Sequence, residues 1–133
     1  LAPEFCVNLF AEYDYFFKTN KTSFVSPSTE REYKYGYQLT LEVEPRYSKK
    51  IAGGKVLNVS LPLTYTMSPE VVIDGTGQDD ASYLLAIAPK LGVVLNRGSS
   101  PLDLEFQYTA PLAGKNAEVT HSISLFATVG LKL

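Results

Sequence analysis

The chain has 133 residues, a length that predicts one domain or part of a larger one. Its formal net charge of −2 and its lack of a basic block exclude the electrostatic pattern of a nucleic-acid-binding protein, so we expect no nucleic-acid partner. Cys6 is the single cysteine, which excludes an internal disulfide and argues against a metal cluster. We expect Cys6 to be a structural, partly buried thiol.

Residues 32–47 alternate almost without fault between apolar side chains at odd positions and polar or charged side chains at even positions. Successive side chains of a strand point to opposite faces, so this pattern predicts a long strand with two chemically different faces. Five other stretches repeat it, and no helical period is evident. The six predicted strands cover residues 4–18, 32–47, 56–68, 81–95, 102–112 and 119–133. They exceed the mean globular strand of about 5–6 residues.

The apolar face carries no formal charge in any of the six predicted strands, whereas the opposite face carries both signs. A lipid-facing surface excludes charge, because Lys or Arg at the bilayer midplane costs about 2–4 kcal/mol. A water-filled lumen accepts both signs. We therefore predict that the charged residues of the opposite face line a lumen: Glu12, Asp14, Lys34, Glu42, Glu44, Arg46, Lys90, Asp103 and Glu105.

Aromatic residues of the apolar face cluster toward one end of the predicted strands. If the C-terminus is periplasmic, these residues fall near the external rim, where amphipathic rings sit at the level of the lipid headgroups. The predicted membrane-interface residues are Tyr13, Tyr15, Phe17, Tyr33, Tyr35, Tyr37, Tyr65, Tyr83 and Tyr108. Long connections at residues 19–31 and 69–80 and shorter ones at 48–55 and 96–101 also suit external loops and periplasmic turns. His121 is read as interfacial.

Three segments carry a family resemblance: residues 56–65 (VLNVSLPLTY), 104–116 (LEFQYTAPLAGKN) and 121–133 (HSISLFATVGLKL). The pattern resembles the C-terminal hairpins of bacterial outer-membrane β-barrel proteins of the porin-like kind. The last segment is similar to the terminal strand signal of such barrels, with Leu133 in place of the terminal aromatic residue. The resemblance implies an all-β, antiparallel up-and-down meander of about six long strands that forms a transmembrane β-barrel or part of one. The expected location is the bacterial outer membrane, with outer-membrane lipid as a partner.

Six strands are fewer than the eight of the smallest single-chain barrels of this class, and open edges in hydrocarbon are forbidden. We therefore expect residues 1–133 to be a single barrel domain or a C-terminal barrel segment. Further strands would come from the same longer protein or from other chains, which we favour, or would lie unrecognised within residues 20–31 or 71–78. The expected function is a passive channel or the wall of a transport conduit, with a charged polar lumen.

Two other arrangements fit the same alternation. One is a soluble secreted β-sandwich at the cell surface, an adhesin or fibre subunit, in which Tyr33, Tyr35 and Tyr37 would pack against a second sheet. The other is a small barrel without a pore. Its lumen would be filled by residues of the polar face: Phe10, Phe16, Leu84 and Phe126.

The sequence predicts no catalytic site and no cofactor. The carboxylates of the polar face lack a legible catalytic partner, and a single His permits no Ser-His-Asp or Cys-His pairing to be read. We expect the chain not to be an enzyme. Asp74, Asp79 and Asp80 form a weak candidate for Ca²⁺ binding, but they match no EF-hand loop and a solvated turn is the preferred interpretation.

Overall fold

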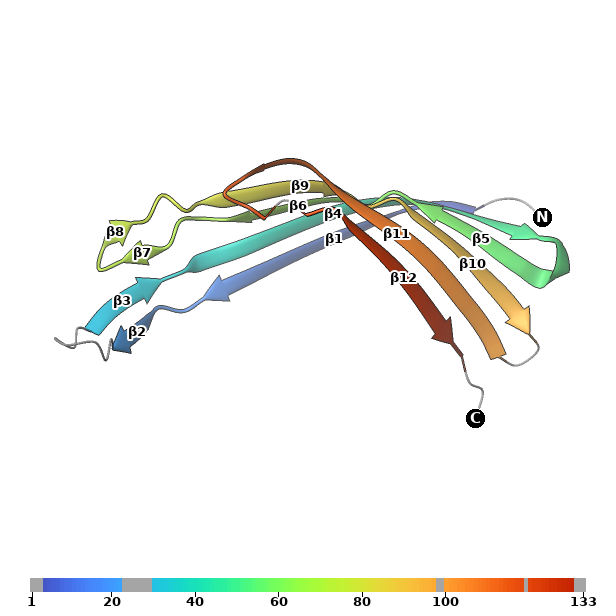
Figure 1. Cartoon of the computed structure of the whole chain (residues 1–133), viewed down its shortest axis with the longest axis horizontal. Helices are drawn as coiled ribbons and strands as arrows, with labels where there is room; N and C mark the ends of the chain where they lie inside the picture. Colours follow the sequence, from blue (N-terminus) through green and yellow to red (C-terminus); the bar gives the residue numbers. More distant parts are fainter. Residues whose placement is uncertain (1–3, 23–29, 98–99, 119, 131–133) are drawn as a thin grey trace.

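The structure is a computed structural model that describes residues 4–22, 30–97, 100–118 and 120–130. Its strands are all antiparallel to their neighbours (Figure 1). The elements are β1 (Glu4–Phe16), β2 (Thr19–Thr22), β3 (Glu30–Lys34), β4 (Gly36–Ile51), the 3-10 turn η1 (Ala52–Gly54), β5 (Lys55–Ser60), β6 (Leu63–Ser68), β7 (Val72–Ile73), β8 (Thr76–Gly77), β9 (Ser82–Ile87), β10 (Lys90–Arg97), β11 (Ser100–Lys115) and β12 (Ser122–Val129). Within the described ranges, no helix is long and apolar enough to cross a membrane.

Eight of these strands form one large sheet. β5 and β6 lie end to end along β4, and β9 and β10 lie end to end along β11, so that the pairings β4–β5–β10–β11–β9–β6 run in a circuit. β1 pairs with β4, and β12 pairs with β11. In chain order the sheet is thus a meander of six ribbons: β1, β4, β5 with β6, β9 with β10, β11 and β12. The predicted all-β antiparallel meander is confirmed.

The large sheet bends in the middle, where β5 gives way to β6 and β9 gives way to β10 (Figure 1). Pro62 separates β5 from β6, and Pro89 separates β9 from β10. Proline has no N–H to donate to the ladder, but its carbonyl still accepts. Ala88 N donates to Pro62 O at 2.9 Å, and Tyr108 N donates to Pro89 O at 3.1 Å. The ribbons therefore stay together across the bend while their strands break.

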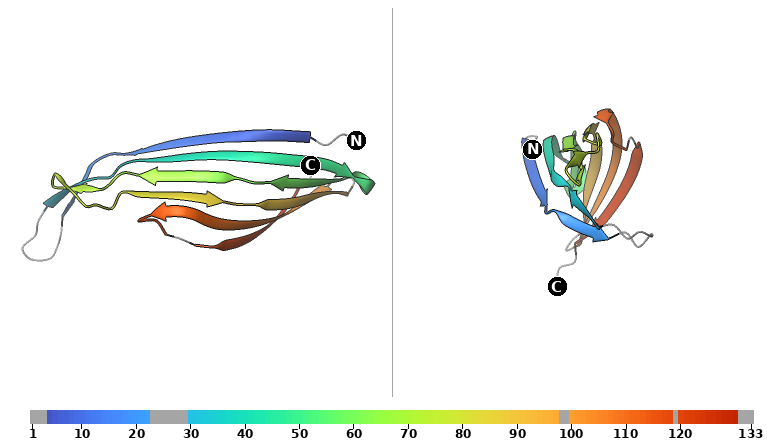
Figure 2. Two further views of the ribbon diagram at one scale, coloured as in Figure 1. Left: turned by 90° about the horizontal axis from the view of Figure 1, so that it is seen from above. Right: turned by 90° about the vertical axis from the view of Figure 1, so that its left-hand side faces the viewer.

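The large sheet is also curved across its strands. Seen end-on, the strands follow an arc from β1 on one side to β12 on the other (Figure 2). The arc closes part of a ring, and no pairing joins β1 to β12 among the described strands. The four most buried positions are Ser60, Pro62, Ala88 and Gly92, all beside the bend. Because the sheet is a single layer, it encloses no core between layers, and burial among the described residues is greatest at this bend.

Residues 32–47 do not form the single strand that the alternation predicts. β3 ends at Lys34 and β4 begins at Gly36, whose φ of +76° is the left-handed conformation that glycine adopts readily. β3 belongs to a second, four-stranded sheet of order β2-β3-β7-β8. This small sheet extends beyond one end of the large sheet (Figure 1).

The two segments predicted as long loops supply strands to this small sheet. β2 lies within residues 19–31, and β7 and β8 lie within residues 69–80. Asp74 and Gly75 have φ of +50° and +80°, which allows a tight two-residue turn between β7 and β8. The loop prediction was wrong here because strands this short leave no legible alternation. Residues 23–29 of the first segment lie outside the described residues, as does the terminal Leu133.

β11 continues beyond residue 112, where the fifth predicted strand ends, as far as Lys115. A β-bulge between Pro111 and Ala113 shifts the register, so that Ala113 lies opposite Leu85 and Lys115 lies opposite Tyr83. A bulge inserts one extra residue and moves the following side chains to the other face. The apolar series of β11 therefore runs through even positions up to Ala110 and through odd positions from Ala113 to Lys115.

We predict that Gly36→Ala destabilises the protein more than Gly53→Ala. Both glycines have φ of +76°, so both substitutions carry a left-handed penalty of about 1 kcal/mol. A Cβ at Gly36 would lie 2.8 Å from Pro69 Cγ, whereas at Gly53 the nearest atom is 4.0 Å away. The overlap should add roughly 1–3 kcal/mol. Denaturant unfolding of the two variants would measure the difference, and equal losses would contradict the close packing of Pro69 against Gly36.

Candidate functional site

The register of the large sheet sorts its side chains onto two faces. The apolar face comprises the odd-numbered residues of β1, β4, β5, β6, β9, β10 and β12 and the even-numbered residues of β11 up to Ala110; the polar face comprises the others. One row shows the continuity of the apolar face across five ribbons: Leu9, Val43, Leu63, Ile87 and Ala110. Each residue of this row lies opposite the next, so the alternation in six separate stretches becomes one surface.

Basic residues occupy both ends of the apolar face. Lys49 and Lys55 hold register positions at the end near η1, and Lys115 holds one at the opposite end. Between these ends, the described part of the apolar face carries no formal charge. Lysine side chains at such positions can cover apolar surface with their stems while the ammonium group remains in water.

In the middle of β4 the apolar side chains are more exposed than the polar side chains between them. In β4, Leu41 and Val43 are 42% and 44% exposed, whereas the intervening Glu42 and the following Glu44 are half-buried. The four most buried positions, at the bend, all lie on the polar face. Side chains on the inside of a curved sheet crowd together and those on the outside spread apart. The polar face is therefore concave and the apolar face convex.

Glu44 is the centre of a hydrogen-bond network on the concave face. Asn8 Nδ2 of β1 donates to its Oε2 at 3.0 Å, and Ser60 Oγ of β5 donates to its Oε1 at 2.7 Å. Lys90 Nζ of β10 lies 3.5 Å from the same Oε1, and the side chains of Lys90 and Glu44 are only 24% and 15% exposed. Four ribbons thus meet at one carboxylate. Its charge is balanced and its oxygens are satisfied, which a half-buried carboxylate requires.

Neighbouring side chains extend this network with neutral donors. Thr64 Oγ1 donates to Glu42 Oε2 at 2.8 Å, and Ser48 Oγ donates to Asn58 Oδ1 at 2.8 Å. The other residues predicted to line a lumen, apart from Lys34, also hold register positions on the polar face: Glu12, Asp14, Arg46, Asp103 and Glu105. The assignment of Lys34 is corrected, because it lies opposite Val72 in the small sheet.

Aromatic rings of adjacent ribbons contact one another near the end of the large sheet that bears the small sheet. Tyr13 stacks on Tyr37 with centroids 5.4 Å apart, and the centroids of Tyr65 and Tyr83 are 6.4 Å apart. Tyr15 lies opposite Tyr37. Tyr108 lies further toward the bend, because its N–H bonds to Pro89. These tyrosines do not all lie in one row of paired residues. In a barrel the strands tilt by about 35–45° to the barrel axis, so residues from different rows can lie at the same height along that axis.

His121 interacts with one of these predicted interface residues. Its ring stacks on that of Tyr108 with centroids 6.0 Å apart, and its Nδ1 is hydrogen-bonded to the Tyr108 hydroxyl at 2.8 Å. Both residues are exposed. The pair joins the start of the last ribbon to β11. His121, for which the sequence indicated no partner, therefore has a defined partner in Tyr108.

The small sheet holds a cluster that the sequence did not reveal. Lys21 Nζ lies 5.1 Å and 5.3 Å from the ring centroids of Tyr33 and Tyr35 and donates to the Tyr35 hydroxyl at 2.7 Å. This hydrogen bond raises the pKa of Lys21 above its ordinary value. Tyr33 and Tyr35 were predicted to continue the aromatic series of the large sheet. They instead flank a lysine beyond its end, and Phe17 lies in the connection from β1 to β2.

The acidic segment at residues 74–80 uses its carboxylates to bind backbone amides. Glu32 N donates to Asp74 Oδ1 at 2.9 Å, and Val71 N donates to Asp80 Oδ1 at 2.6 Å. Asn116 Nδ2 donates to the Asp79 carbonyl at 3.2 Å. Within the described ranges, no three His, Cys, Asp or Glu residues are grouped to hold a metal ion. Asp74, Asp79 and Asp80 therefore do not assemble into the weak Ca²⁺ site considered from the sequence.

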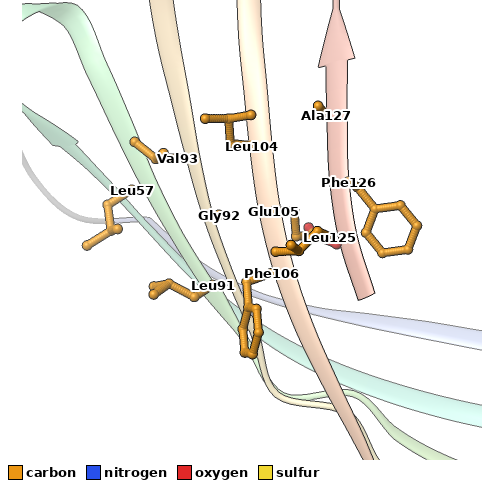
Figure 3. Close-up of a pocket in the computed structure, with 10 residues that line it drawn as sticks. All are labelled: Leu57, Leu91, Gly92, Val93, Leu104, Glu105, Phe106, Leu125, Phe126 and Ala127. Carbon is orange, nitrogen blue, oxygen red and sulfur yellow. The ribbon is translucent and has the colours of Figure 1, made fainter. Parts of the chain in front are cut away.

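The apolar face contains an open hollow of about 540 Å³ between side chains of β5, β10, β11 and β12 (Figure 3). Leu57, Leu91, Phe106 and Leu125 line it, and its rim is almost wholly apolar. The hollow lies on one face of a single sheet and is not enclosed between layers. Cys6, on the polar face of β1, is exposed, so the expectation of a partly buried thiol was wrong. The edge position of β1 explains the exposure.

Comparison with known proteins returned no match of any kind: no family model, no curated protein and no solved structure matches this chain.

We predict that Glu44 and Lys90 are energetically coupled. Removing either partner leaves a half-buried charge without its counterion, whereas removing both partners leaves no unpaired charge. Glu44→Gln and Lys90→Met should each destabilise the protein, and the double variant should lose about 1 kcal/mol less than the sum. Unfolding of the four species gives the coupling energy. The exposed pair Lys18–Glu32, 3.1 Å apart, is the control and should show a smaller coupling.

Proposed function

We propose that this chain forms part of the wall of an outer-membrane β-barrel that acts as a passive channel or transport conduit. The apolar face would contact lipid, and the polar face would line an aqueous lumen. This is the arrangement suggested by the resemblance to porin-like hairpins.

The observation that carries the proposal is the direction of curvature relative to polarity. A soluble barrel or sandwich encloses its apolar face, because burial of apolar surface stabilises the fold by about 25 cal/mol per Å². Here the apolar face is convex, and Leu9 and Leu125 on it are 77% and 78% exposed. The charged side chains are on the inside of the curve. Lipid is the solvent that makes such an arrangement favourable.

Strand length and charge placement also support the proposal. β1 has 13 residues, and β4 and β11 each have 16, whereas a tilted transmembrane strand needs about 9–11. Lys49 and Lys115 then fall near opposite interfaces, where a basic side chain can reach the headgroups. The aromatic contacts between Tyr13 and Tyr37 lie toward the same end as Lys115 and would form part of an interfacial girdle.

The alternative is a soluble secreted β-sandwich, in which a second layer covers the apolar face. The small sheet is the nearest candidate for that layer within the described chain. It extends from the end of the large sheet and does not lie over its apolar face (Figure 2). A sandwich would therefore need a layer from another source.

Cysteine labelling along β4 tests which face meets water. In a Cys6→Ser background, single cysteines at Thr40, Leu41, Glu42 and Val43 would be introduced and the protein reconstituted into lipid vesicles. A water-soluble maleimide should label positions 40 and 42 and spare positions 41 and 43, because alternate residues face opposite sides. Equal labelling of all four, or a chain that stays soluble without detergent, would contradict the proposal. Ion conductance across planar bilayers then tests for an open lumen.

We further predict that Val43→Lys destabilises the membrane-inserted protein by about 2–4 kcal/mol, since a lysine would then face hydrocarbon. The matched control is Thr40→Lys, on the polar face opposite Glu12, which should change stability far less. Denaturant titration in vesicles measures both. If the apolar face of this single-layer sheet instead met water, Val43→Lys would behave as a surface substitution, within about 0.5 kcal/mol of the parent.

A further inference from the structure

The two outer strands of the large sheet each have one free edge. β1 is paired only with β4, and β12 only with β11, among the described strands. All 13 residues of β1 are exposed. An unpaired strand edge is costly in hydrocarbon, because each unsatisfied backbone group costs several kcal/mol there. A membrane-inserted sheet therefore requires a strand beside β1 and another beside β12.

Aromatic side chains mark these two edges on the polar face. Within the described sheet, every phenylalanine on that face belongs to an edge strand: Phe10 and Phe16 to β1, and Phe126 to β12. They are 53%, 45% and 52% exposed. Phe126 projects from the side of β12 opposite to Leu125 (Figure 3). In the same rows the inner strands carry polar or small residues: Glu42, Thr64 and Ala86 beside Phe10, and Glu105, Gly92 and Asn58 beside Phe126. The phenylalanines therefore suit a contact between edges and not a water-filled wall.

The direction of the strands allows the two edges to pair with each other. Successive ribbons are antiparallel, and the meander has six, so β12 runs antiparallel to β1. In an antiparallel ladder whose register pairs Phe10 with Phe126, Glu12 would lie opposite Ser124. The apolar face would remain continuous, with Ala11 opposite Leu125. Phenylalanines placed opposite each other can pack as a cross-strand pair.

Closure within one chain is disfavoured by the width of the resulting ring. An eight-stranded barrel has an interior just wide enough for its side chains, and six ribbons would leave less. The concave face already carries seven charged side chains on inner strands of the described sheet: Glu42, Glu44, Arg46, Lys50, Lys90, Asp103 and Glu105. A wider ring, made of more than one chain, would keep them hydrated.

We infer that β12 of one copy pairs with β1 of a second copy, so that the barrel wall is a closed ring of identical chains. The inference rests on the proposed membrane function. The contact is heterologous: one copy presents Phe126 and the next presents Phe10. Repetition of the contact around the ring leaves no free edge.

The test uses the full chain in detergent and in vesicles, with cysteines at Glu12 and Ser124 in a Cys6→Ser background. A short bismaleimide, which tolerates a small shift in register, should cross-link separate chains into a ladder of multiples of the chain mass. The control pair, Glu12 and Leu125, places the two cysteines on opposite faces and should give no ladder. Native mass spectrometry should give an assembled mass that is a whole multiple of the chain.

Other outcomes overturn the inference. A cross-link confined to single chains would show closure within one chain. A membrane-inserted species without the ladder, or with a mass that is not a multiple of the chain, would show that other strands complete the sheet. In these cases protection of β4 from maleimide in vesicles would leave the membrane proposal standing. If the protein did not insert into the membrane at all, both the ring of chains and the proposed membrane function would be contradicted.

A substitution separates the edge contact from general stability. Phe126→Ser should weaken assembly roughly ten- to a hundredfold, as expected for losing one buried phenylalanine contact. Phe5→Ser, on the apolar face of β1, is the matched control and should leave the assembly midpoint unchanged. Equal effects of the two substitutions would contradict the edge contact.

Discussion

The register of the backbone ladder is the constraint on which the rest of this structure depends. A slip of one residue between two strands would move every side chain of one strand to the other face. Because the ribbons keep their register, Leu9, Val43, Leu63 and Ile87 form a single apolar row. The row beside it contains Phe10, Glu42, Thr64 and Ala86. The sheet has no second layer, so the separation of its faces is its main organising feature.

Curvature gives these two faces different environments. The break at Pro62 and Pro89 bends the sheet, and the positions beside it become its most buried. The polar side chains on the inside of the bend approach closely enough to bond, and Glu44 collects contacts from β1, β5 and β10. The same curvature spreads the apolar side chains apart. A surface of this kind is stable when its convex side meets lipid and its concave side meets water, which is the basis of the proposed function.

The departures from the predicted strands arise at points where local chemistry overrides the alternation. Gly36 adopts a positive φ between β3 and β4, so Tyr33 and Lys34 enter the small sheet even though their sequence continues the pattern of the large one. The bulge after Pro111 similarly moves Lys115 to the apolar face. Alternation reports which residues share a face only while the strand is unbroken. A glycine or a bulge resets the phase without changing the composition of the segment.

The sequence by itself determined that the chain is an antiparallel all-β meander with one apolar and one charged face, because strand periodicity is a local property. It also identified most of the charged residues of the concave face, including Glu42, Glu44 and Lys90. Only the tertiary structure decided the sense of curvature, the partners of Glu44 and the existence of the small sheet. It alone showed that, among the described strands, β1 and β12 each leave one edge unpaired, and that Phe10 and Phe126 lie on these two strands. These features depend on contacts between residues far apart in the chain, which no local pattern records.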